Sequence, residues 1–424
     1  MNSRGLMTRR NVVSGVLALA AAGVFISRKS DLGGAHGEYF QKLTRALRRA
    51  RIAQPVIVID RTRLRQNASA AARVLADKRL PLRVVVKSLP APQLIDDVAA
   101  ALQTQRYMVF NGVMLLETAK RGTQIDALLG KPLPVEAARQ FYDAMSAARI
   151  DYSEPQWLID APERLQQYAQ LARERDRPMR INLEIDVGLH RGGAASADEL
   201  LALVRGAQAE PKLVVSGLMG YDAHVPRMPN VESAWRASQA HYATALEAMR
   251  SVYGESVARL TLNSAGSPTY RMHAQGTAAN EVSVGSAFVK PADFDLDTLT
   301  HHAPAAFIAT PVIKALNCAQ IPGLESLTGL RRFMNPNTER AFFIYGGHWL
   351  ARPESPPGLE FSSLYGRSSN QELLMGSSAV HLRVDDYVFF RPMQSEALLL
   401  QFGDLLVYEN GEISQRWPTY GVSA

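Results

Sequence analysis

The sequence predicts an α/β protein, a (β/α)8 barrel of the TIM type followed by a mainly antiparallel β domain. From residue 55, short apolar runs alternate with helix-length segments, and eight such units fall within about 210 residues. From about residue 303 the pattern changes to short strands broken by Pro and Gly. Strand–helix alternation favours a parallel sheet covered by helices, and eight units in this length favour a closed barrel.

A buried strand at 55–60 and a helix over 61–77 come before the barrel. Helices are also expected over 161–175, 197–208 and 232–252. Ser196, with Glu199 three residues on, predicts a capping box at the start of the 197–208 helix. The eight expected barrel strands are, in order, Leu82–Ser88, Arg106–Phe110, Ile125–Gly130, Gln156–Asp160, Met179–Val187, Lys212–Tyr221, Arg259–Ser264 and Glu281–Val289.

The last third of the chain shows no helix-length periodicity. We expect antiparallel strands at Leu382–Pro392, Ala397–Phe402 and Leu405–Tyr408. Asn410-Gly411 follows the last of these strands and predicts a type I′ hairpin. The expected domains are therefore a barrel over 52–300 and a β domain over 303–424.

Composition and charge indicate a soluble globular protein that does not bind nucleic acid. The 424 residues are 47% hydrophobic and 21% charged, which is ordinary for a folded domain. Residues 1–51 hold ten Lys and Arg against two Asp and Glu, so the net charge of +7 comes from the N-terminal tail. The rest is close to neutral and predicts no basic face for nucleic acid. The single cysteine, Cys318, excludes an intrachain disulfide and a multi-cysteine metal site.

Residues 1–30 resemble an export signal or a membrane anchor. Basic residues precede the uncharged run Val12–Ile26, whose 15 residues are short for a membrane span of about 20 and fit the core of a signal peptide. Thr8-Arg9-Arg10-Asn11-Val12-Val13 resembles a twin-arginine signal. We expect a periplasmic or inner-membrane-anchored protein whose N-terminal segment contacts the membrane. The alternative is a cytoplasmic protein in which this stretch is a short buried helix.

Functional groups of such barrels gather at the carboxyl ends of the strands. The first strand leads into Lys87, whose amine would lie in the barrel mouth and act as a Schiff-base nucleophile. The fifth leads into Arg191, where flanking glycines allow the tight turn that would present its guanidinium inward. Most lysines at strand ends are simply solvated. For Arg191 the alternative is an ion pair with Asp186, and His190 is expected to be a supporting or surface residue.

Two small-residue turns follow the seventh and eighth strands, at 264–269 and 283–286. Converging backbone N–H groups and hydroxyls at these two strand ends are how TIM-type barrels hold a phosphate. Each turn alone would be an ordinary loop. Together with Lys87 they describe a cradle for a phosphorylated cofactor that carries a reactive aldehyde.

Over about residues 50–420 the chain resembles the fold-type III pyridoxal-phosphate enzymes, in which an alanine-racemase-type barrel is joined to a D-serine-dehydratase-like C-terminal domain. D-threonine aldolases and D-serine dehydratases have this arrangement. Six segments in the family's order carry the resemblance: VVVKS (84–88), EIDVGLHRGG (184–193), GLMGYDAH (217–224), NSAGSPTY (263–270), EVSVGSAFV (281–289) and PMQSEALLLQFGDLLVYENGEISQRWP (392–418).

The resemblance implies pyridoxal 5′-phosphate as the cofactor, held by Lys87 as a Schiff base. It implies that Arg191 contacts the pyridine nitrogen and that Tyr221 lies near the cofactor face. It also implies a homodimer in which the C-terminal domain completes the partner's site. By the same resemblance the phosphate lies among Ser264, Gly266, Ser267, Gly285 and Ser286.

The chain departs from the family where the metal-dependent members carry a His-x-Cys pair. Gln394 and Glu396 stand in those two positions, and the earlier stretch Ser369–Leu373 also lacks the family's histidine. Zinc prefers nitrogen and sulfur ligands, whereas these side chains offer only oxygens. We expect no tightly bound metal. A harder cation, Mg²⁺ or Mn²⁺ on Glu372 and Glu396, is the alternative.

The expected function is that of a pyridoxal-phosphate-dependent lyase acting on 3-hydroxy D-amino acids, as in D-threonine aldolases or D-serine dehydratases. Without a metal, Glu396 would be the base that handles the β-hydroxyl. The first alternative is an amino-acid racemase or epimerase, in which Tyr221 or His224 would be a second base opposite Lys87. The second is a non-catalytic cofactor carrier. Single-barrel carriers lack the C-terminal β domain that this chain keeps, which favours catalysis.

Overall fold

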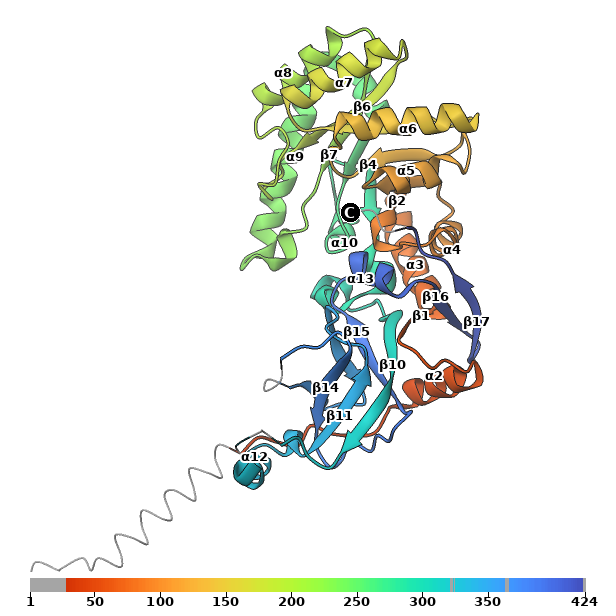
Figure 1. The fold of residues 1–424 in the computed structure, drawn as a ribbon. Helices are drawn as coiled ribbons and strands as arrows, with labels where there is room; N and C mark the ends of the chain where they lie inside the picture. Colours follow the sequence, from red (N-terminus) through yellow and green to blue (C-terminus); the bar gives the residue numbers. More distant parts are fainter. Residues whose placement is uncertain (1–27, 321–322, 324, 363–365, 422–424) are drawn as a thin grey trace, which may run out of the picture. The chain divides into compact units, whose positions relative to one another are not determined.

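The computed structural model of the protein describes residues 28–320, 323, 325–362 and 366–421 (Figure 1). The predicted signal or anchor segment therefore lies almost wholly outside the described residues. By their contacts the described residues divide into two compact units. The barrel unit holds Ile57–Phe307 and the chain from Pro392 onward. The β unit holds the residues up to Val56 together with Ile308–Arg391.

The barrel unit contains a closed barrel of eight parallel strands, which confirms the predicted fold class and the order of all eight strands. The barrel closes where Leu82 of the first strand pairs with Val282 of the last. Seven of the eight strands end earlier than predicted, and the differences are largest for the first, which ends at Val85, and the last, which ends at Val284. The strands are β2 (Leu82–Val85), β3 (Arg106–Val109), β4 (Asp126–Leu129), β5 (Gln156–Ile159), β6 (Met179–Ile185), β7 (Leu213–Gly220), β8 (Thr261–Ser264) and β9 (Glu281–Val284).

Helices alternate with the strands and place their apolar faces against the barrel. In α8 the buried residues Leu200, Leu203, Val204 and Ala207 follow the spacing of a single helix face. At its start the Ser196 hydroxyl accepts the Glu199 N–H, while the Glu199 carboxylate accepts the N–H of residue 195. The helices are α3 (Arg61–Ala76), α4 (Pro92–Leu102), α5 (Gly112–Ala119), α6 (Val135–Ala148), α7 (Pro162–Glu174), α8 (Ala197–Gln208) and α9 (Val231–Tyr253).

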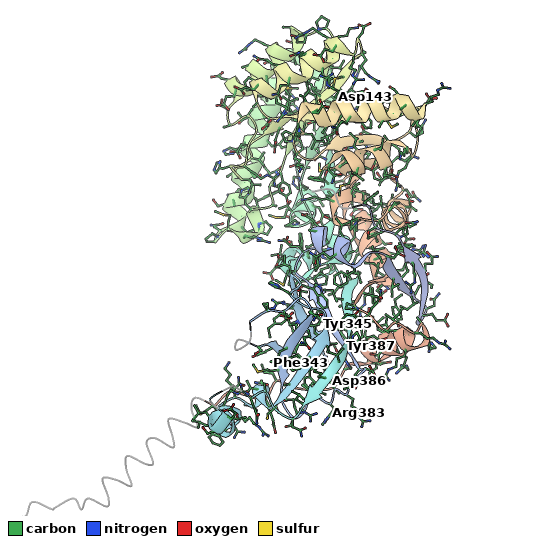
Figure 2. All side chains as sticks on the ribbon, in the orientation of Figure 1. Asp143, Phe343, Tyr345, Arg383, Asp386 and Tyr387 are labelled. Atoms are coloured by element: carbon green, nitrogen blue, oxygen red, sulfur yellow. The ribbon has the colours of Figure 1, made fainter. Side chains whose placement is uncertain are left out.

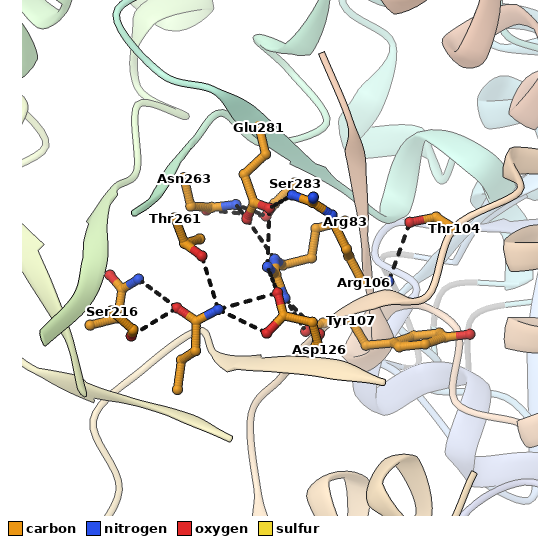
Figure 3. A network of polar contacts seen from close by, with 12 residues as sticks. Arg83, Thr104, Arg106, Tyr107, Asp126, Ser216, Thr261, Asn263, Glu281 and Ser283 are labelled. Carbon is orange, nitrogen blue, oxygen red and sulfur yellow. Dashed lines mark hydrogen bonds and ion pairs between the residues drawn. The ribbon is translucent and has the colours of Figure 1, made fainter. Parts of the chain in front are cut away.

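A buried polar network fills the amino-terminal end of the barrel (Figure 3). The fully buried Arg83 guanidinium donates to Glu281 Oε1 and to Asp126 Oδ2, both at 2.6 Å. Arg106 also donates to Glu281, and Gln156 donates to Asp126. Although burial opposes ionisation, Arg83 holds the pKa of Asp126 down at about 2. This end of the barrel is thus closed by ion pairs, and the open end is the carboxyl end.

The C-terminal segment belongs to the barrel unit. Its strand β16 (Leu405–Glu409) pairs in parallel with β1 (Val56–Asp60) and turns into β17 (Glu412–Trp417). Asn410 has φ 51° and Gly411 has φ 82°, the backbone that a type I′ turn requires, so the predicted hairpin is confirmed.

The predicted strand at Ala397–Phe402 is wrong. Residues 396–399 form the short helix α13 (Glu396–Leu399), and a 3-10 turn continues to Phe402. The stretch Ala-Leu-Leu-Leu-Gln contains good helix formers and no β-branched residue. Short apolar runs do not distinguish strand from helix by periodicity. The helix places Glu396 in its first turn.

The β unit contains a mainly antiparallel sheet, as predicted. Its strands run in the order β13–β14–β11–β10–β15, with β12 pairing to β15, and the four pairings along this order are antiparallel. The seven-residue helix α12 (Thr328–Met334) was not expected, because two turns are too short to show a period. The strands are β10 (Ala306–Leu316), β11 (Arg340–Tyr345), β12 (Ala351–Ser355), β13 (Glu360–Phe361), β14 (Gln371–Gly376) and β15 (Tyr387–Pro392).

The basic helix α2 (Glu38–Arg49) belongs to this unit, where Arg48 pairs with Asp386 at 2.5 Å and Tyr387 donates to the Ile52 carbonyl. Figure 2 labels Asp386 and Tyr387 at the start of β15. The strand predicted from Leu382 begins only at Tyr387. Across the described residues, none of the helices combines the length and apolar character that a membrane span needs.

Candidate cofactor site

A cavity lies at the carboxyl ends of the barrel strands. The structure brings most of the predicted site residues to it. Ser264 is not among the lining residues, and its hydroxyl donates instead to the Gly220 carbonyl at the end of β7. The predicted residues that line the cavity are Lys87, Arg191, Tyr221, Gly266, Ser267, Gly285, Ser286 and Glu396.

Lys87 lies just beyond β2, in a 3-10 turn formed by Val86–Ser88. Its half-buried Nζ is 2.7 Å from Oε1 of Glu396, which comes from α13. The same Nζ lies 4.6 Å from the centre of the Phe110 ring, a cation–π distance. The amine is therefore held between a carboxylate and an aromatic face, at the edge of the cavity.

Arg191 lies over the ring of Tyr221, with its guanidinium carbon 4.7 Å from the ring centre. Gly188 has φ 104° and Gly192 has φ 146°, so the turn that presents Arg191 needs glycine at these positions. The alternative pairing of Arg191 with Asp186 does not form. Asp186 instead accepts hydrogen bonds from the backbone N–H groups of Gly188 and His190, and its other oxygen lies 2.7 Å from His190 Nδ1.

His190 itself is a surface residue, because 79% of its side chain is exposed.

Two buried groups near Arg191 have shifted pKa values. Burial raises the pKa of Tyr221 above its ordinary value, so this phenol is neutral at pH 7. Burial also raises the pKa of Glu184 to about 7, while the nearby Arg191 partly offsets it. Glu184 stands in the EIDVG segment, two residues before Asp186. Its burial could not be predicted from the sequence.

The two predicted phosphate turns converge through Ser267. Its hydroxyl accepts hydrogen bonds from the backbone N–H groups of Gly285 and Ala287, at 3.1 and 3.0 Å. A Cβ on Gly285 would lie 2.7 Å from the Val85 side chain, and one on Gly266 would lie 2.6 Å from the Tyr221 ring. These glycines are therefore required by the close approach of neighbouring side chains.

Three buried serine hydroxyls continue this lining, and two of them were missed from the sequence. Ser286 Oγ lies 3.0 Å from Ser88 Oγ and 3.2 Å from Ser395 Oγ. Ser88 directly follows Lys87 in the sequence, and this position could have identified it as a site residue. The serine hydroxyls of this lining can donate hydrogen bonds to a phosphate. A phosphate group and an aldehyde carried by one molecule thus fit the residues present.

A buried acidic group connects the first phosphate turn with Tyr221. Asp222, the next residue in the chain, accepts a hydrogen bond from the Thr269 hydroxyl, and Thr269 in turn accepts the Gly266 N–H at 3.1 Å. The other Asp222 oxygen lies 2.8 Å from His273 Nε2. Asp222, Thr269 and His273 are completely buried. This network holds the turn at 264–269 in place relative to Tyr221, whose ring packs against Gly266.

The positions that hold metal ligands in the resembling enzymes are engaged in other contacts. Gln394 donates to Asp293 at 3.3 Å, and Glu396 pairs with Lys87. In the β unit, Glu372 accepts the His348 N–H at 2.6 Å and pairs with Arg367. Among the described residues there is no group of three or more His, Cys, Asp or Glu side chains suited to a metal ion.

The model of the alanine racemase N-terminal domain matches residues 59–292, more than half of the chain. A comparison with curated protein sequences finds no match. Three solved structures are similar in fold. D-threonine aldolase from Filomicrobium marinum has a TM-score of 0.70 at 15% identity, covering 87% of this chain and 97% of its own.

D-threo-3-hydroxyaspartate dehydratase from Delftia sp. HT23 has a TM-score of 0.68 at 15% identity, covering 88% of this chain and 98% of its own. Alanine racemase from Bacillus anthracis has a TM-score of 0.63 at 13% identity, covering 87% of this chain and 98% of its own. At these identities the likeness shows a shared fold, in which lyases and racemases both occur.

Proposed function

Because the chain belongs to the family defined by the alanine racemase N-terminal domain, we propose that it is a pyridoxal-phosphate-dependent lyase of 3-hydroxy D-amino acids. Members of this family of folds use pyridoxal 5′-phosphate and act on small amino acids. The observation that carries the proposal is the contact of 2.7 Å between Lys87 and Glu396. The cavity beside them is lined by serine hydroxyls, which can donate hydrogen bonds to a phosphate. We infer that this amine and this carboxylate act where an aldehyde and an amino acid would meet.

Lys87 would bond covalently to the cofactor aldehyde, and the turns that meet at Ser267 would hold its phosphate. We assign Arg191 to the pyridine nitrogen, where a guanidinium would keep that nitrogen unprotonated. When bound, the cofactor supplies an electron-poor ring that accepts the electrons of a bond broken at the substrate's α-carbon. The stacking of Arg191 on Tyr221 fixes the guanidinium for this contact.

Glu396 is the residue that we expect to move protons. Its oxygen lies within hydrogen-bond reach of Lys87 Nζ, so it would hold this amine at the edge of the cavity. The same half-buried carboxylate faces the cavity, where it would take or give the proton of a substrate β-hydroxyl. In this chain it would do so without a tightly bound metal, since Gln394 contacts Asp293 and Glu396 pairs with Lys87.

The substrate class follows from chemistry at the β-carbon. Two of the structural neighbours carry names that specify D-threonine and D-threo-3-hydroxyaspartate, both 3-hydroxy D-amino acids. Their fold covers nearly nine tenths of this chain. A base beside the reactive lysine is what loss or transfer of a β-hydroxyl proton requires.

Racemisation is the second candidate, and one observation favours it. Tyr221 lines the same cavity as Lys87 and is protonated at neutral pH, so the site offers two groups for proton exchange at an α-carbon. An alanine racemase is also among the structural neighbours.

The homodimer that the sequence predicts stays a prediction. A measurement of the mass of the protein in solution tests it.

Product analysis distinguishes these functions. The purified protein with pyridoxal 5′-phosphate is incubated with D-threonine, D-serine and both enantiomers of alanine, followed by chiral amino-acid analysis. We expect glycine plus an aldehyde, or a keto acid plus ammonia, from the hydroxy substrates, with rates unchanged by chelators. Interconversion of the alanine enantiomers would establish a racemase instead. Absence of any product would support the non-catalytic carrier, and activity restored only by zinc would contradict the metal-free site.

Glu396→Gln tests the proposed base. The amide keeps the size of the side chain but cannot take a proton, so kcat should fall by about 10²–10⁴-fold while the cofactor stays bound. Glu412→Gln, an exposed position on β17, is the matched control and should leave kcat unchanged. Steady-state kinetics together with the visible spectrum measure both effects. A Glu396→Gln enzyme with the kcat of the wild type would remove Glu396 from the mechanism.

A further inference from the structure

The helix α12 and the turn before it expose an apolar surface on the β unit. Leu327, Leu330 and Phe333 are 49%, 60% and 42% exposed. Their spacing of three residues places them on one side of the helix. Of the 13 large apolar side chains that are exposed among the described residues, these three fall within seven consecutive positions. A fourth, Leu32, is 56% exposed. We call Leu32, Leu327, Leu330 and Phe333 the α12 patch.

The described chain begins directly beside the α12 patch. The N–H of Lys29 donates to the carbonyl of Met334, the last residue of α12, at 3.0 Å. The Arg28 guanidinium lies 5.3 Å from the centre of the Phe333 ring. Asn337, just beyond the helix, donates to the Ser30 carbonyl and accepts the Leu32 N–H, both at 2.8 Å. Residues 28–32 are thus tied to the end of α12.

This attachment matters because of the sequence that comes before it. The uncharged run Val12–Ile26 ends two positions before Arg28. A surface that binds residues 12–26 would also lie close to the α12 patch. Residues 28–32 are attached to the end of α12, so few residues separate the run from the patch. An apolar run of 15 residues is suited to lipid rather than to water.

The charges beside the patch are those that an anionic lipid surface attracts. Arg28 and Lys29 are exposed next to Phe333, and Arg332 of α12 is half-exposed while it pairs with Glu339. Basic side chains that flank leucine and phenylalanine are typical of segments that lie in the headgroup region of a membrane. A short apolar patch is a weak anchor alone, and stable attachment needs a second signal. The run at 12–26 supplies one.

We propose that the α12 patch rests on the surface of an anionic bilayer, next to the point where residues 12–26 meet it. The β unit, and not only the N-terminal segment, would then contact the membrane. This inference does not depend on the proposed reaction. It assigns a role to exposed apolar side chains that neither the core nor the cofactor site uses.

Hydrogen exchange of the full chain tests the proposal, because it reports on α12 separately from the N-terminal segment. Backbone amides of 325–334 are followed by mass spectrometry with and without vesicles of phosphatidylcholine containing about a third phosphatidylglycerol. We expect their exchange to slow about tenfold when the vesicles are added. The double variant Leu330→Ser with Phe333→Ser should lose this protection. Leu350→Ser, an equally exposed leucine at 58%, should keep it.

Two outcomes would overturn the proposal. In the first, the protein binds the vesicles but exchange over 325–334 is unchanged, which would mean that the N-terminal segment alone makes the contact. In the second, the same amides are protected without vesicles in proportion to protein concentration, which would mean that a second copy covers the patch. The substituted side chains are exposed, so thermal unfolding of the variants should match the wild type and exclude misfolding as the cause.

Discussion

Replacement of Lys87 by alanine is expected to abolish the visible absorption band of the protein loaded with pyridoxal 5′-phosphate. Nζ of Lys87 is the amine that faces the phosphate-type donors, and without it the aldehyde has no covalent partner at the cavity. Activity should fall by several orders of magnitude. The measurement is the spectrum after removal of free cofactor, together with the initial rate.

Lys120→Ala is the control for this substitution. Lys120 directly follows α5, is partly exposed and pairs with Glu117, outside the cavity. Its variant should keep both the absorption band and the rate. A Lys87→Ala protein that still shows the band after desalting would mean that another amine holds the cofactor.

Arg83→Met is expected to lower the free energy of unfolding by about 3–5 kcal/mol, because it removes the fully buried cation that Glu281 and Asp126 share. The fully buried Glu281 would keep only Arg106, whose side chain is 42% exposed, and Asp126 would keep Arg180 at 3.3 Å. Urea unfolding at pH 7 measures the effect. The double variant Arg83→Met with Glu281→Leu should recover part of the loss, since it also removes the buried carboxylate that Arg83 neutralised. A loss below about 1 kcal/mol would show that the ion pairs are not what stabilises this end of the barrel.

The effect of Arg83→Met should depend on pH with a definite sign. In the wild type the pKa of Asp126 is lowered from 3.8 to about 2, so its stabilising contribution is present above pH 4 and is lost as the pH falls through 2. In the variant the carboxylates of Asp126 and Glu281 have lost the cation that they share and bind protons more readily. The difference in stability between the two proteins should therefore shrink as the pH falls from 7 to 4.

The barrel could be predicted from the sequence because its information is local. Each of the eight strands is a short apolar run next to a helix-length segment, and their order gives the topology. The exact ends could not be read in this way. Lys87 looks like the end of a strand, but the β2–β9 ladder stops at Val84, after which the chain turns. The α13 helix was mistaken for a strand because its apolar run is too short to have a period.

The site was partly predictable for the same reason. Lys87, Arg191 and the two phosphate turns each follow a strand, so their type and place in the chain were enough. Ser395 and the Asp222–His273 pair were not. Ser395 meets Ser286 across 109 residues, and Asp222 meets His273 across 51. Such contacts arise from the packing of the barrel and leave no mark in the local pattern.

The same limit applies to the contact between Lys87 and Glu396. From the sequence, Glu396 is a substitution at a metal-ligand position, and its partner is not visible. The structure pairs it with Lys87. We therefore propose that Glu396, a carboxylate next to the Lys87 amine, carries the protons of the reaction.

Reductive trapping tests the central claim most directly. The loaded protein is reduced with borohydride, digested, and its peptides are analysed by mass spectrometry. We expect one phosphopyridoxyl group, on Lys87. A group fixed on another lysine, or none in a protein that binds the cofactor, would contradict it.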